Sequence, residues 1–180
     1  MKRLCGDILD IFGQAYMVGG ALRDAALKKS FKDLDLAVPG GPHFKAGTFK
    51  LASKLNAACF PLDEKNLVYR LKTRKAPLIQ LDIAPFQGKN LGEDLARRDF
   101  TVNAMALPLE RALKFALDKK SGALRLASFD RKKIIDPLGG LESASKKELK
   151  AASPGIFKED PLRALRAFRL AAGLGFRINS

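Results

Sequence analysis

Apolar residues along the first half of the chain follow two spacings, one typical of helices and one typical of strands. Apolar residues three and four positions apart predict helices over residues 4–12, 21–29 and 44–55. Short apolar runs bounded by polar turns predict strands over residues 15–18, 34–38, 59–62, 67–73 and 78–84. This mixture of elements predicts a sheet domain of the α+β (mixed α/β) class.

The character of the chain changes near Asp136. Residues 136–140 read Asp-Pro-Leu-Gly-Gly, which interrupts regular structure, and the following residues are rich in Lys, Ala, Leu and Arg, which favour helix. We therefore expect a sheet domain over residues 1–135 and a helical segment over residues 136–180. A helical unit of about 45 residues is close to the size at which a lone core is marginal. We therefore expect the sequence to be part of a longer protein.

The net charge of the chain is +14, from 33 Lys and Arg against 19 Asp and Glu. This excess favours a polyanionic partner through long-range attraction, although a solubilising surface explains it equally simply. Cys5, Cys59 and His43 are too few for a disulfide framework or a zinc site. No apolar run is long enough for a membrane span, and the N-terminal residues carry acids where a signal peptide needs an uninterrupted apolar stretch, so we expect no export. We expect no membrane partner and a cytoplasmic location.

The most informative segment extends from Tyr16 to Val38. A predicted strand leads into Gly19-Gly20 and then into a helix, and such a turn lets phosphate approach the backbone and the helix start. Arg23, one turn into this helix, is placed to contact a phosphate oxygen. Asp33 and Asp35 are two residues apart on a predicted strand, so their side chains share one face. Paired carboxylates on one face are typical of two-Mg²⁺ sites for nucleotidyl transfer.

Asp82 is the candidate for a third metal-binding carboxylate, because it interrupts the apolar run 78–84. An acid within a strand is disfavoured and costly to bury, so we expect it to have a charged partner. From the residues alone, an exposed aspartate on the solvent face is an equally good interpretation.

Two further clusters have both a functional and a structural interpretation. Arg97 and Arg98 stand beside Asp99, with Asn103 four residues later, as expected of groups that hold a triphosphate and a ribose. The structural alternative is that Asp99 caps a helix whose arginines face solvent.

The second cluster is a predicted amphipathic helix within residues 158–176. Its apolar stripe consists of Leu162, Leu165, Phe168 and Ala172. The opposite, polar side consists of Glu159, Arg163, Arg166 and Arg169. Asp160 and Arg163 form an acceptor and donor pair that matches the edge of a nucleotide base. The structural alternative is a helix-stabilising Glu159–Arg163 ion pair.

Together and in this order, these motifs resemble the bacterial tRNA nucleotidyltransferase and poly(A) polymerase family, class II of the polymerase β-like superfamily. The matching motifs are Gly19-Gly20-x-x-Arg23, Asp33-x-Asp35, Arg97-Arg98-Asp99 with Asn103, Asp136-Pro137-x-Gly139-Gly140, and Glu159-Asp160-x-x-Arg163-x-x-Arg166. The resemblance extends from Tyr16 to Phe176. It implies a nucleotidyltransferase head, with a mixed β-sheet flanked by helices, followed by a helical neck.

The resemblance also implies roles for individual residues. Asp33, Asp35 and Asp82 would hold two Mg²⁺ ions, one activating the RNA 3′-hydroxyl and the other stabilising the triphosphate and the leaving pyrophosphate. The phosphates and sugar would be held by Gly19, Gly20, Arg23, Arg98, Asp99 and Asn103. Asp160 and Arg163, supported by Arg166, would select the base of ATP or CTP. The implied activity is template-independent addition of nucleotides to an RNA 3′ end, with tRNA the leading substrate and poly(A) synthesis close behind.

Three other functions are less consistent with the sequence. An antibiotic or protein nucleotidyltransferase would not need the helix from Glu159 to Arg169. A non-catalytic RNA- or nucleotide-binding domain of the same fold would be marked by loss of the metal-binding acids, yet Asp33 and Asp35 are both present. A dinucleotide-dependent oxidoreductase would need a longer glycine fingerprint and a downstream ribose-binding acid.

Overall fold

The computed structural model describes residues 2–75, 78–111, 115–117, 123–126 and 129–179. Its centre is a six-stranded mixed sheet with the strand order β3-β4-β5-β2-β1-β6. Strands β2 and β5 are parallel, and the other neighbouring pairs are antiparallel. The strands are β1 (Tyr16–Val18), β2 (Asp33–Val38), β3 (Ala57–Asp63), β4 (Val68–Thr73), β5 (Gln80–Pro85) and β6 (Ala106–Pro108).

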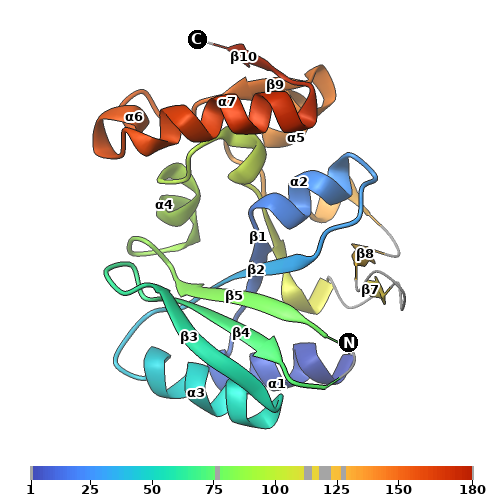
Figure 1. Cartoon of the computed structure of the whole chain (residues 1–180), viewed down its shortest axis with the longest axis vertical. Helices are drawn as coiled ribbons and strands as arrows, with labels where there is room; N and C mark the ends of the chain where they lie inside the picture. The colour runs from blue at the N-terminus through green and yellow to red at the C-terminus, as the bar shows by residue number, and fades with distance from the viewer. Residues whose placement is uncertain (1, 76–77, 112–114, 118–122, 127–128, 180) are drawn as a thin grey trace.

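Two helices, α1 (Lys2–Phe12) and α3 (Phe44–Lys54), cover one face of the sheet (Figure 1). Alternation along β2 points Leu34 and Leu36 into the core beneath that face. The intervening residues Asp33 and Asp35 therefore point to the opposite face. On that side lie α2 (Gly20–Ala26), α4 (Leu91–Ala96) and the C-terminal part of the chain.

The C-terminal part contains α5 (Gly140–Lys146), α6 (Ile156–Glu159) and α7 (Leu162–Leu174). A second hydrophobic core joins α5 and α7 to the short helix η1 (Thr101–Asn103), and its buried members are Phe100, Val102, Ala144, Leu149, Ala167 and Phe176. Because Phe100 and Val102 belong to this core, residues 136–179 pack directly on the segment that follows α4. The division at residue 136 stays a prediction.

The Asp-Pro-Leu-Gly-Gly segment forms the start of α5. The Asp136 carboxylate accepts hydrogen bonds from the backbone N–H groups of Gly140 (2.6 Å) and Leu141 (2.8 Å), so it satisfies two free donors of the helix start. A Cβ at Gly140 would overlap the carbonyl oxygen of Thr101. The glycine therefore allows α5 to pack closely on η1.

The elements predicted for the first 85 residues are confirmed, with ends that differ by up to three residues. Among the later elements, the helix predicted within residues 158–176 is found as α7, whereas several short elements were not predicted, because they lack a full period of apolar residues. They are α4, β6, η2 (Leu109–Arg111), the hairpin of β7 (Phe115–Leu117) and β8 (Leu124–Leu126), η3 (Arg131–Lys133), and the parallel pair of β9 (Glu148–Lys150) and β10 (Arg177–Asn179). Within the described ranges, no helix has the length and apolar character that a membrane span needs.

Helix α7 does not bury the apolar stripe that its sequence predicts. Leu162, Leu165 and Phe168 are each 66% exposed. The helix packs instead through Ala167, which is buried, and through the partly buried side chains of Leu170, Ala171 and Leu174. The small side chains at 167 and 171 allow α7 to approach the second core closely, and this turns the larger apolar side chains outward.

Candidate active site

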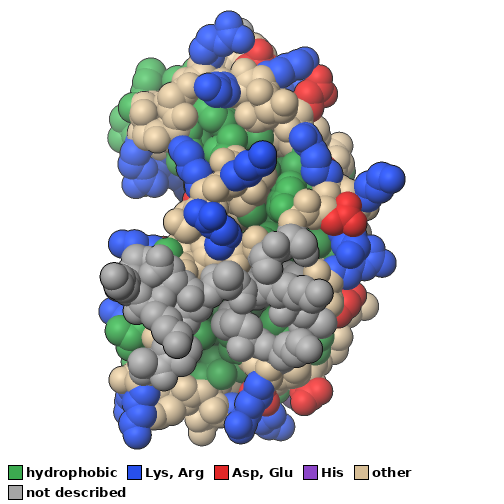
Figure 2. All heavy atoms as spheres, turned by 90° about the vertical axis from the view of Figure 1, so that its right-hand side faces the viewer, with side chains coloured by type: hydrophobic (Ala, Val, Ile, Leu, Met, Phe, Trp, Pro, Cys, Tyr) green, Lys and Arg blue, Asp and Glu red, His purple; other side chains and the backbone are tan. Residues whose placement is uncertain are grey.

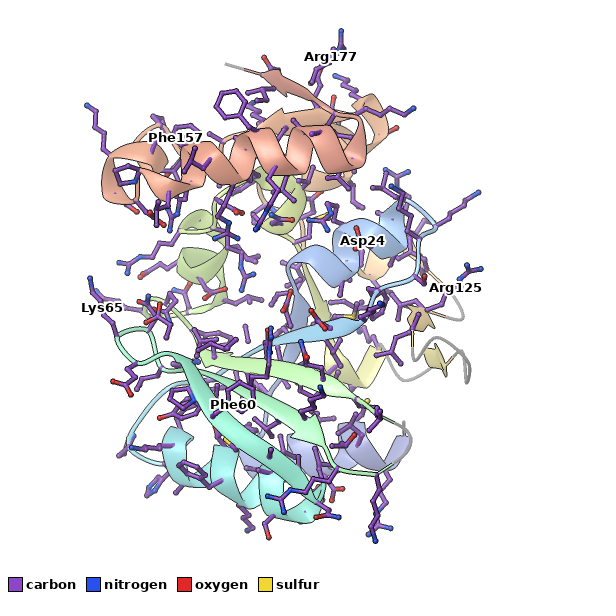
Figure 3. All side chains as sticks on the ribbon, viewed as in Figure 1. Asp24, Phe60, Lys65, Arg125, Phe157 and Arg177 are labelled. Carbon is purple, nitrogen blue, oxygen red and sulfur yellow. The ribbon has the colours of Figure 1, made fainter. Side chains whose placement is uncertain are left out.

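A cavity of about 720 Å³ lies between the open face of the sheet, α4 and the α6–α7 junction. Figure 3 shows Lys65 at the tip of the β3–β4 turn on one side of this region and Phe157 of α6 on the other. The cavity is lined by Gly19, Gly20, Asp35, Lys65, Asn66, Val68, Gln87, Asp94, Arg97, Arg98, Asp99, Asn103, Glu159, Asp160, Pro161, Arg163 and Arg166. Its lining therefore brings together residues that are up to 147 positions apart (19 to 166) in the sequence.

The three predicted metal-binding aspartates lie on two adjacent strands. Asp35 of β2 is directly opposite Asp82 of β5, and Asp33 is opposite Gln80. Since β2 and β5 are parallel, residues in register point to the same face. Asp35 lines the cavity, whereas Asp33 lies at its edge and is exposed.

Asp82 is held by Arg70 of β4. The guanidinium donates from Nε to Oδ1 (2.7 Å) and from Nη2 to Oδ2 (2.6 Å), which is a bidentate ion pair. This hydrogen-bonded pairing raises the pKa of Arg70. The expectation of a charged partner for Asp82 is confirmed, and its side chain is 15% exposed, so it does not lie free on a solvent face.

The pKa of Asp35 is raised from 3.8 to about 6. Burial is the largest cause, because a charged carboxylate loses its hydration there. The negative charge of Asp82 is the second cause, and Asp33 adds a smaller increase. The charge of Arg98 and a hydrogen bond from the backbone N–H of Gly20 lower the pKa of Asp35. The sheet therefore holds negative charges close together at its open face.

Gly19 allows the turn before α2 to lie against Asp35. Its φ is +69°, a conformation that favours glycine, and a Cβ there would lie 2.6 Å from Oδ2 of Asp35. The same hypothetical Cβ would be 3.4 Å from Nη1 of Arg98. The turn, the aspartate and the arginine therefore converge on one small volume.

Arg98 is oriented by Asp94 of α4. Its Nε and Nη2 donate to Oδ2 of Asp94 at 3.1 and 3.0 Å, and Oδ1 of Asp94 accepts from the backbone N–H of Gln87 (2.9 Å). Asp94 is 3% exposed. Both oxygens of the Asp94 carboxylate are occupied, which fixes this carboxylate and so holds Arg98 in one orientation. Arg98 can present its remaining N–H groups to an anion in the cavity.

Asp99 and Asn103 form a buried polar network beneath the cavity. Oδ1 of Asp99 accepts from the backbone N–H of Phe100 (2.8 Å) and from Nδ2 of Asn103 (3.0 Å). Oδ1 of Asn103 accepts from Nη1 of Arg23 (2.9 Å). Nη2 of Arg166 lies 2.9 Å from Oδ2 of Asp99, an ion-pair contact without hydrogen-bond alignment. Asp99 thus links α7 to the segment that follows α4.

Arg163 points from α7 toward the two acids at the α6–α7 junction. Its Nε is 3.7 Å from Oδ2 of Asp160, and its Nη1 is 3.6 Å from Oε2 of Glu159. Oδ1 of Asp160 accepts from the backbone N–H of Leu162 (3.0 Å), which fixes this carboxylate at the start of α7. An anchored acceptor and an anchored donor therefore face the cavity side by side.

Most of the site residues predicted from the sequence come together in this cavity. Gly19, Gly20, Asp35, Arg98, Asp99, Asn103, Asp160, Arg163 and Arg166 line it. Asp33 and Asp82 lie beside it on the sheet. Arg23 is not among the lining residues: it lies against Gly20, donates to Asn103 and bonds Asp24. Arg23 therefore orients another side chain in this structure and does not face the cavity.

The sequence interpretation did not include Arg70, Asp94, Lys65, Asn66 or Gln87. Three of them owe their place to tertiary contacts. Arg70 belongs to the site because β4 pairs with β5, and Asn66 and Gln87 because Nε2 of Gln87 donates to the backbone carbonyl of Asn66 (3.0 Å). Asp94 carried one signal, since it lies four residues before Arg98 on one helix face.

The donor set of Asp33, Asp35 and Asp82 fits a hard divalent cation such as Mg²⁺, which prefers carboxylate oxygens. Burial, and after it the charge of Asp82, raises the pKa of Asp35, and a bound cation would offset both by stabilising the ionised carboxylate. Across the described ranges, no three acidic, His or Cys side chains are already grouped closely enough to coordinate an ion. Asp82 in particular has both oxygens on Arg70, so binding by all three acids needs side-chain adjustment.

The chain has the fold of a nucleotidyltransferase head, a mixed sheet with in-register aspartates at its open face. Within this fold class it belongs to the family of the poly(A) polymerase head domain, which matches residues 15–150.

Curated relatives share sequence with most of the chain. A CC-adding tRNA nucleotidyltransferase of Geobacter sulfurreducens is 35% identical over 167 residues, covering 92% of this chain and 33% of its own length. An A-adding tRNA nucleotidyltransferase of Deinococcus radiodurans is 34% identical over 164 residues, covering 91% and 31%. The chain therefore spans about a third of the length of these relatives.

A solved structure confirms the similarity in three dimensions. It is a tRNA nucleotidyltransferase complexed with a primer tRNA and an incoming ATP analogue, and it matches with a TM-score of 0.69 at 31% identity. The match covers 97% of this chain and 46% of that one. The fold predicted from the sequence, a nucleotidyltransferase head followed by a helical neck, is confirmed.

Proposed function

We propose that the chain transfers nucleotides from CTP or ATP to the 3′ end of tRNA without a template, releasing pyrophosphate. One observation carries this proposal most directly: a single cavity contains Asp35, the Gly19-Gly20 turn with Arg98, and the Asp160–Arg163 pair. These groups match the catalytic centre, the triphosphate and the base of a nucleoside triphosphate. The relatives that add CC or A to tRNA support the choice of substrates.

The nucleotide would lie along the cavity with its phosphates near the sheet. Arg98, fixed by Asp94, would donate to triphosphate oxygens, and Gly19 leaves space for them against Asp35. Asn103, held by Arg23 and Asp99, would contact the ribose. Arg163 and Asp160 would donate to and accept from the edge of the base, because their side chains are anchored before the nucleotide arrives.

Asp33, Asp35 and Asp82 would hold two Mg²⁺ ions. When bound, these ions would lower the pKa of the RNA 3′-hydroxyl and neutralise charge on the triphosphate and the leaving pyrophosphate. Arg70 would keep the Asp82 carboxylate at the sheet surface. Among the described residues, Asp82 is paired with Arg70, whereas Asp35 has no ion pair. Added positive charge is therefore best placed beside Asp35.

A cytoplasmic location is part of the same proposal. Two free cysteines, one of them buried, are consistent with a reducing compartment.

The test is nucleotide incorporation by the full chain on two labelled RNAs, a tRNA lacking its terminal CCA and an unstructured RNA. CTP and ATP are supplied separately and together, with Mg²⁺. The comparison variant is Asp33→Asn with Asp35→Asn, and the matched control is Asp10→Asn, an exposed aspartate of α1 on the other face of the sheet.

We expect CTP-dependent, ATP-dependent or sequential addition on the tRNA only, which would distinguish CC-, A- and CCA-adding activity. Addition should be lost in the double variant and kept in Asp10→Asn. Long ATP-dependent tails on both RNAs would instead assign poly(A) synthesis to the chain, in place of tRNA 3′-end addition. No incorporation by the unmodified chain, or equal incorporation by the double variant, would contradict the proposal and favour a non-catalytic nucleotide- or RNA-binding domain.

A further inference from the structure

Five basic side chains lie around the N-terminal end of β2, outside the lining of the nucleotide cavity. Three lie in the segment that links α2 to β2, one comes from β4 and one from β8. We refer to them as the basic rim, which consists of Lys28, Lys29, Lys32, Lys72 and Arg125.

The fold brings these residues to one end of the sheet. Lys32 directly precedes Asp33, and Phe31 pairs with Leu124 of β8, which places Arg125 beside the same linker. In the sheet, Lys72 is opposite Gln80, which in turn is opposite Asp33. Because Lys72 is two residues from Arg70, it points to the same face as the Arg70–Asp82 pair. The rim therefore borders the carboxylates directly.

The positive charge of the rim is not neutralised within the protein. All five side chains are exposed, and none forms an ion pair with any residue in the described part of the chain. Of the acids close to the rim in sequence, Asp24 pairs with Arg23 and Asp130 with Lys133, while Asp33 and Asp35 belong to the aspartate cluster at the open face of the sheet. Figure 2 shows Lys and Arg spread over this side of the molecule, and Figure 3 shows Arg125 directed away from the sheet. This surface fits a polyanion.

The geometry of nucleotidyl transfer says which polyanion must arrive here. The attacking hydroxyl and the leaving pyrophosphate lie roughly in line on opposite sides of the reacting phosphorus. The residues proposed to bind the triphosphate are Gly19, Gly20 and Arg98, and they line the cavity together with Asp35. Asp33 lies outside the cavity at the other end of the aspartate pair. The hydroxyl must therefore approach past Asp33, where the rim is.

We propose that the basic rim binds the backbone phosphates of the single-stranded 3′ end of the RNA and guides its terminal hydroxyl to Asp33. This inference rests on the proposed function and adds the path of the acceptor strand. Four of the five residues are lysines, which act as point charges and contact phosphates without reading bases. The rim should therefore bind RNA ends of any sequence, and base selection should stay with the nucleotide cavity.

The test measures RNA affinity and nucleotide affinity separately on the full chain. The rim variant is Lys28→Gln, Lys29→Gln and Lys32→Gln together. Its matched control is Lys45→Gln, Lys50→Gln and Lys89→Gln, which removes the same charge from exposed lysines outside the rim. A short single-stranded RNA labelled at its 5′ end is followed by fluorescence anisotropy across a range of salt concentrations, with a blunt RNA duplex as the second probe. Binding of ATP and CTP is measured by calorimetry.

We expect the rim variant to bind the single strand roughly tenfold more weakly than the control variant does at low salt. Loss of three phosphate contacts should also reduce the slope of log affinity against log salt by about 2, at about 0.7 per contact for single strands. ATP and CTP should bind with unchanged affinity. As a second measurement, a photoreactive thiouridine at the RNA 3′ end should cross-link within residues 28–32 or at Lys72.

The inference is overturned if the rim and control variants lose affinity equally, if neither loses any, if the duplex is preferred, or if the cross-links fall elsewhere. Failure of the proposed function would give a different result. The unmodified chain would incorporate no nucleotide, yet it would still bind the RNA end, and the rim variant would still bind that RNA more weakly.

Discussion

Replacing Asp35 by asparagine should stabilise the folded chain at neutral pH when no divalent cation is present. The raised pKa of Asp35, from 3.8 to about 6, means that its ionised form is unfavourable in the fold. At about 1.4 kcal/mol per pKa unit, the cost is on the order of 3 kcal/mol. Asparagine has the same shape without the charge, but burying its polar amide also costs free energy. We therefore expect a net gain in stability of about 1–2 kcal/mol.

The sign of the pH dependence follows from proton binding. Between pH 3.8 and about 6 the folded state binds the Asp35 proton more tightly than the unfolded state does. The stability of the unmodified chain therefore contains a contribution that is present at low pH and is lost as the pH rises through this window. Asp35→Asn has no such proton. The difference between the two proteins should be near zero below about pH 4 and largest above about pH 6.

Urea unfolding at a series of pH values, in the presence of a chelator, measures this difference. A gain of about 1–2 kcal/mol corresponds to a rise of roughly 2–8 °C in the thermal midpoint for a chain of this size. Asp10→Asn is the control for removal of an acidic group from a strongly basic protein. Added Mg²⁺ should stabilise the unmodified chain more than Asp35→Asn. A variant that is destabilised at pH 7, or a difference that does not change with pH, would refute the reasoning.

Two further substitutions test the contacts around the sheet carboxylates. Arg70→Ala should destabilise the chain by about 1–3 kcal/mol, because it leaves Asp82 partly buried beside Asp35, and Arg70→Ala with Asp82→Ala should recover part of that loss. Chemical unfolding of the four proteins of this cycle measures the coupling, and additive losses would contradict it. Gly19→Ala should cost about 1–2 kcal/mol because of its positive φ and its approach to Asp35. It should also weaken ATP binding by calorimetry, whereas Gly6→Ala in α1, where a Cβ has free space, should leave it unchanged.

The fold could be predicted where the apolar period is long enough to be distinctive. The helix over 44–55 and the strand over 34–38 each present a full period, and both are confirmed. Strand β6 is three residues long, and its backbone pairs with β1, some ninety residues earlier (Ala106 with Val18). No local pattern encodes such a pairing. The final helix shows a different limit, because periodicity predicted which residues of α7 are apolar but not which of its faces packs.

Spacing predicted which residues of the site share an element, but it did not predict how residues of different elements are placed beside one another. The pair Asp33 and Asp35 follows from strand alternation alone. The position of Asp82 beside Asp35 depends on the parallel register of β2 and β5, which no local signal specifies. Arg23 was expected to face a phosphate, yet it bonds Asp24 and Asn103, because α2 packs against η1. Whether it reaches a phosphate in the nucleotide complex stays a prediction.

The distribution of ion pairs within the cavity is the strongest electrostatic argument for a cation at the sheet. Among its described lining residues, Asp94 pairs with Arg98, Asp99 with Arg166, and both Glu159 and Asp160 with Arg163. Asp35 is the one acidic member of that lining without an ion pair. In a chain of net charge +14, arginine or lysine is abundant enough to neutralise every acid. An acid that stays unpaired with a raised pKa, and in register with a second carboxylate, is arranged for positive charge that the protein itself does not supply.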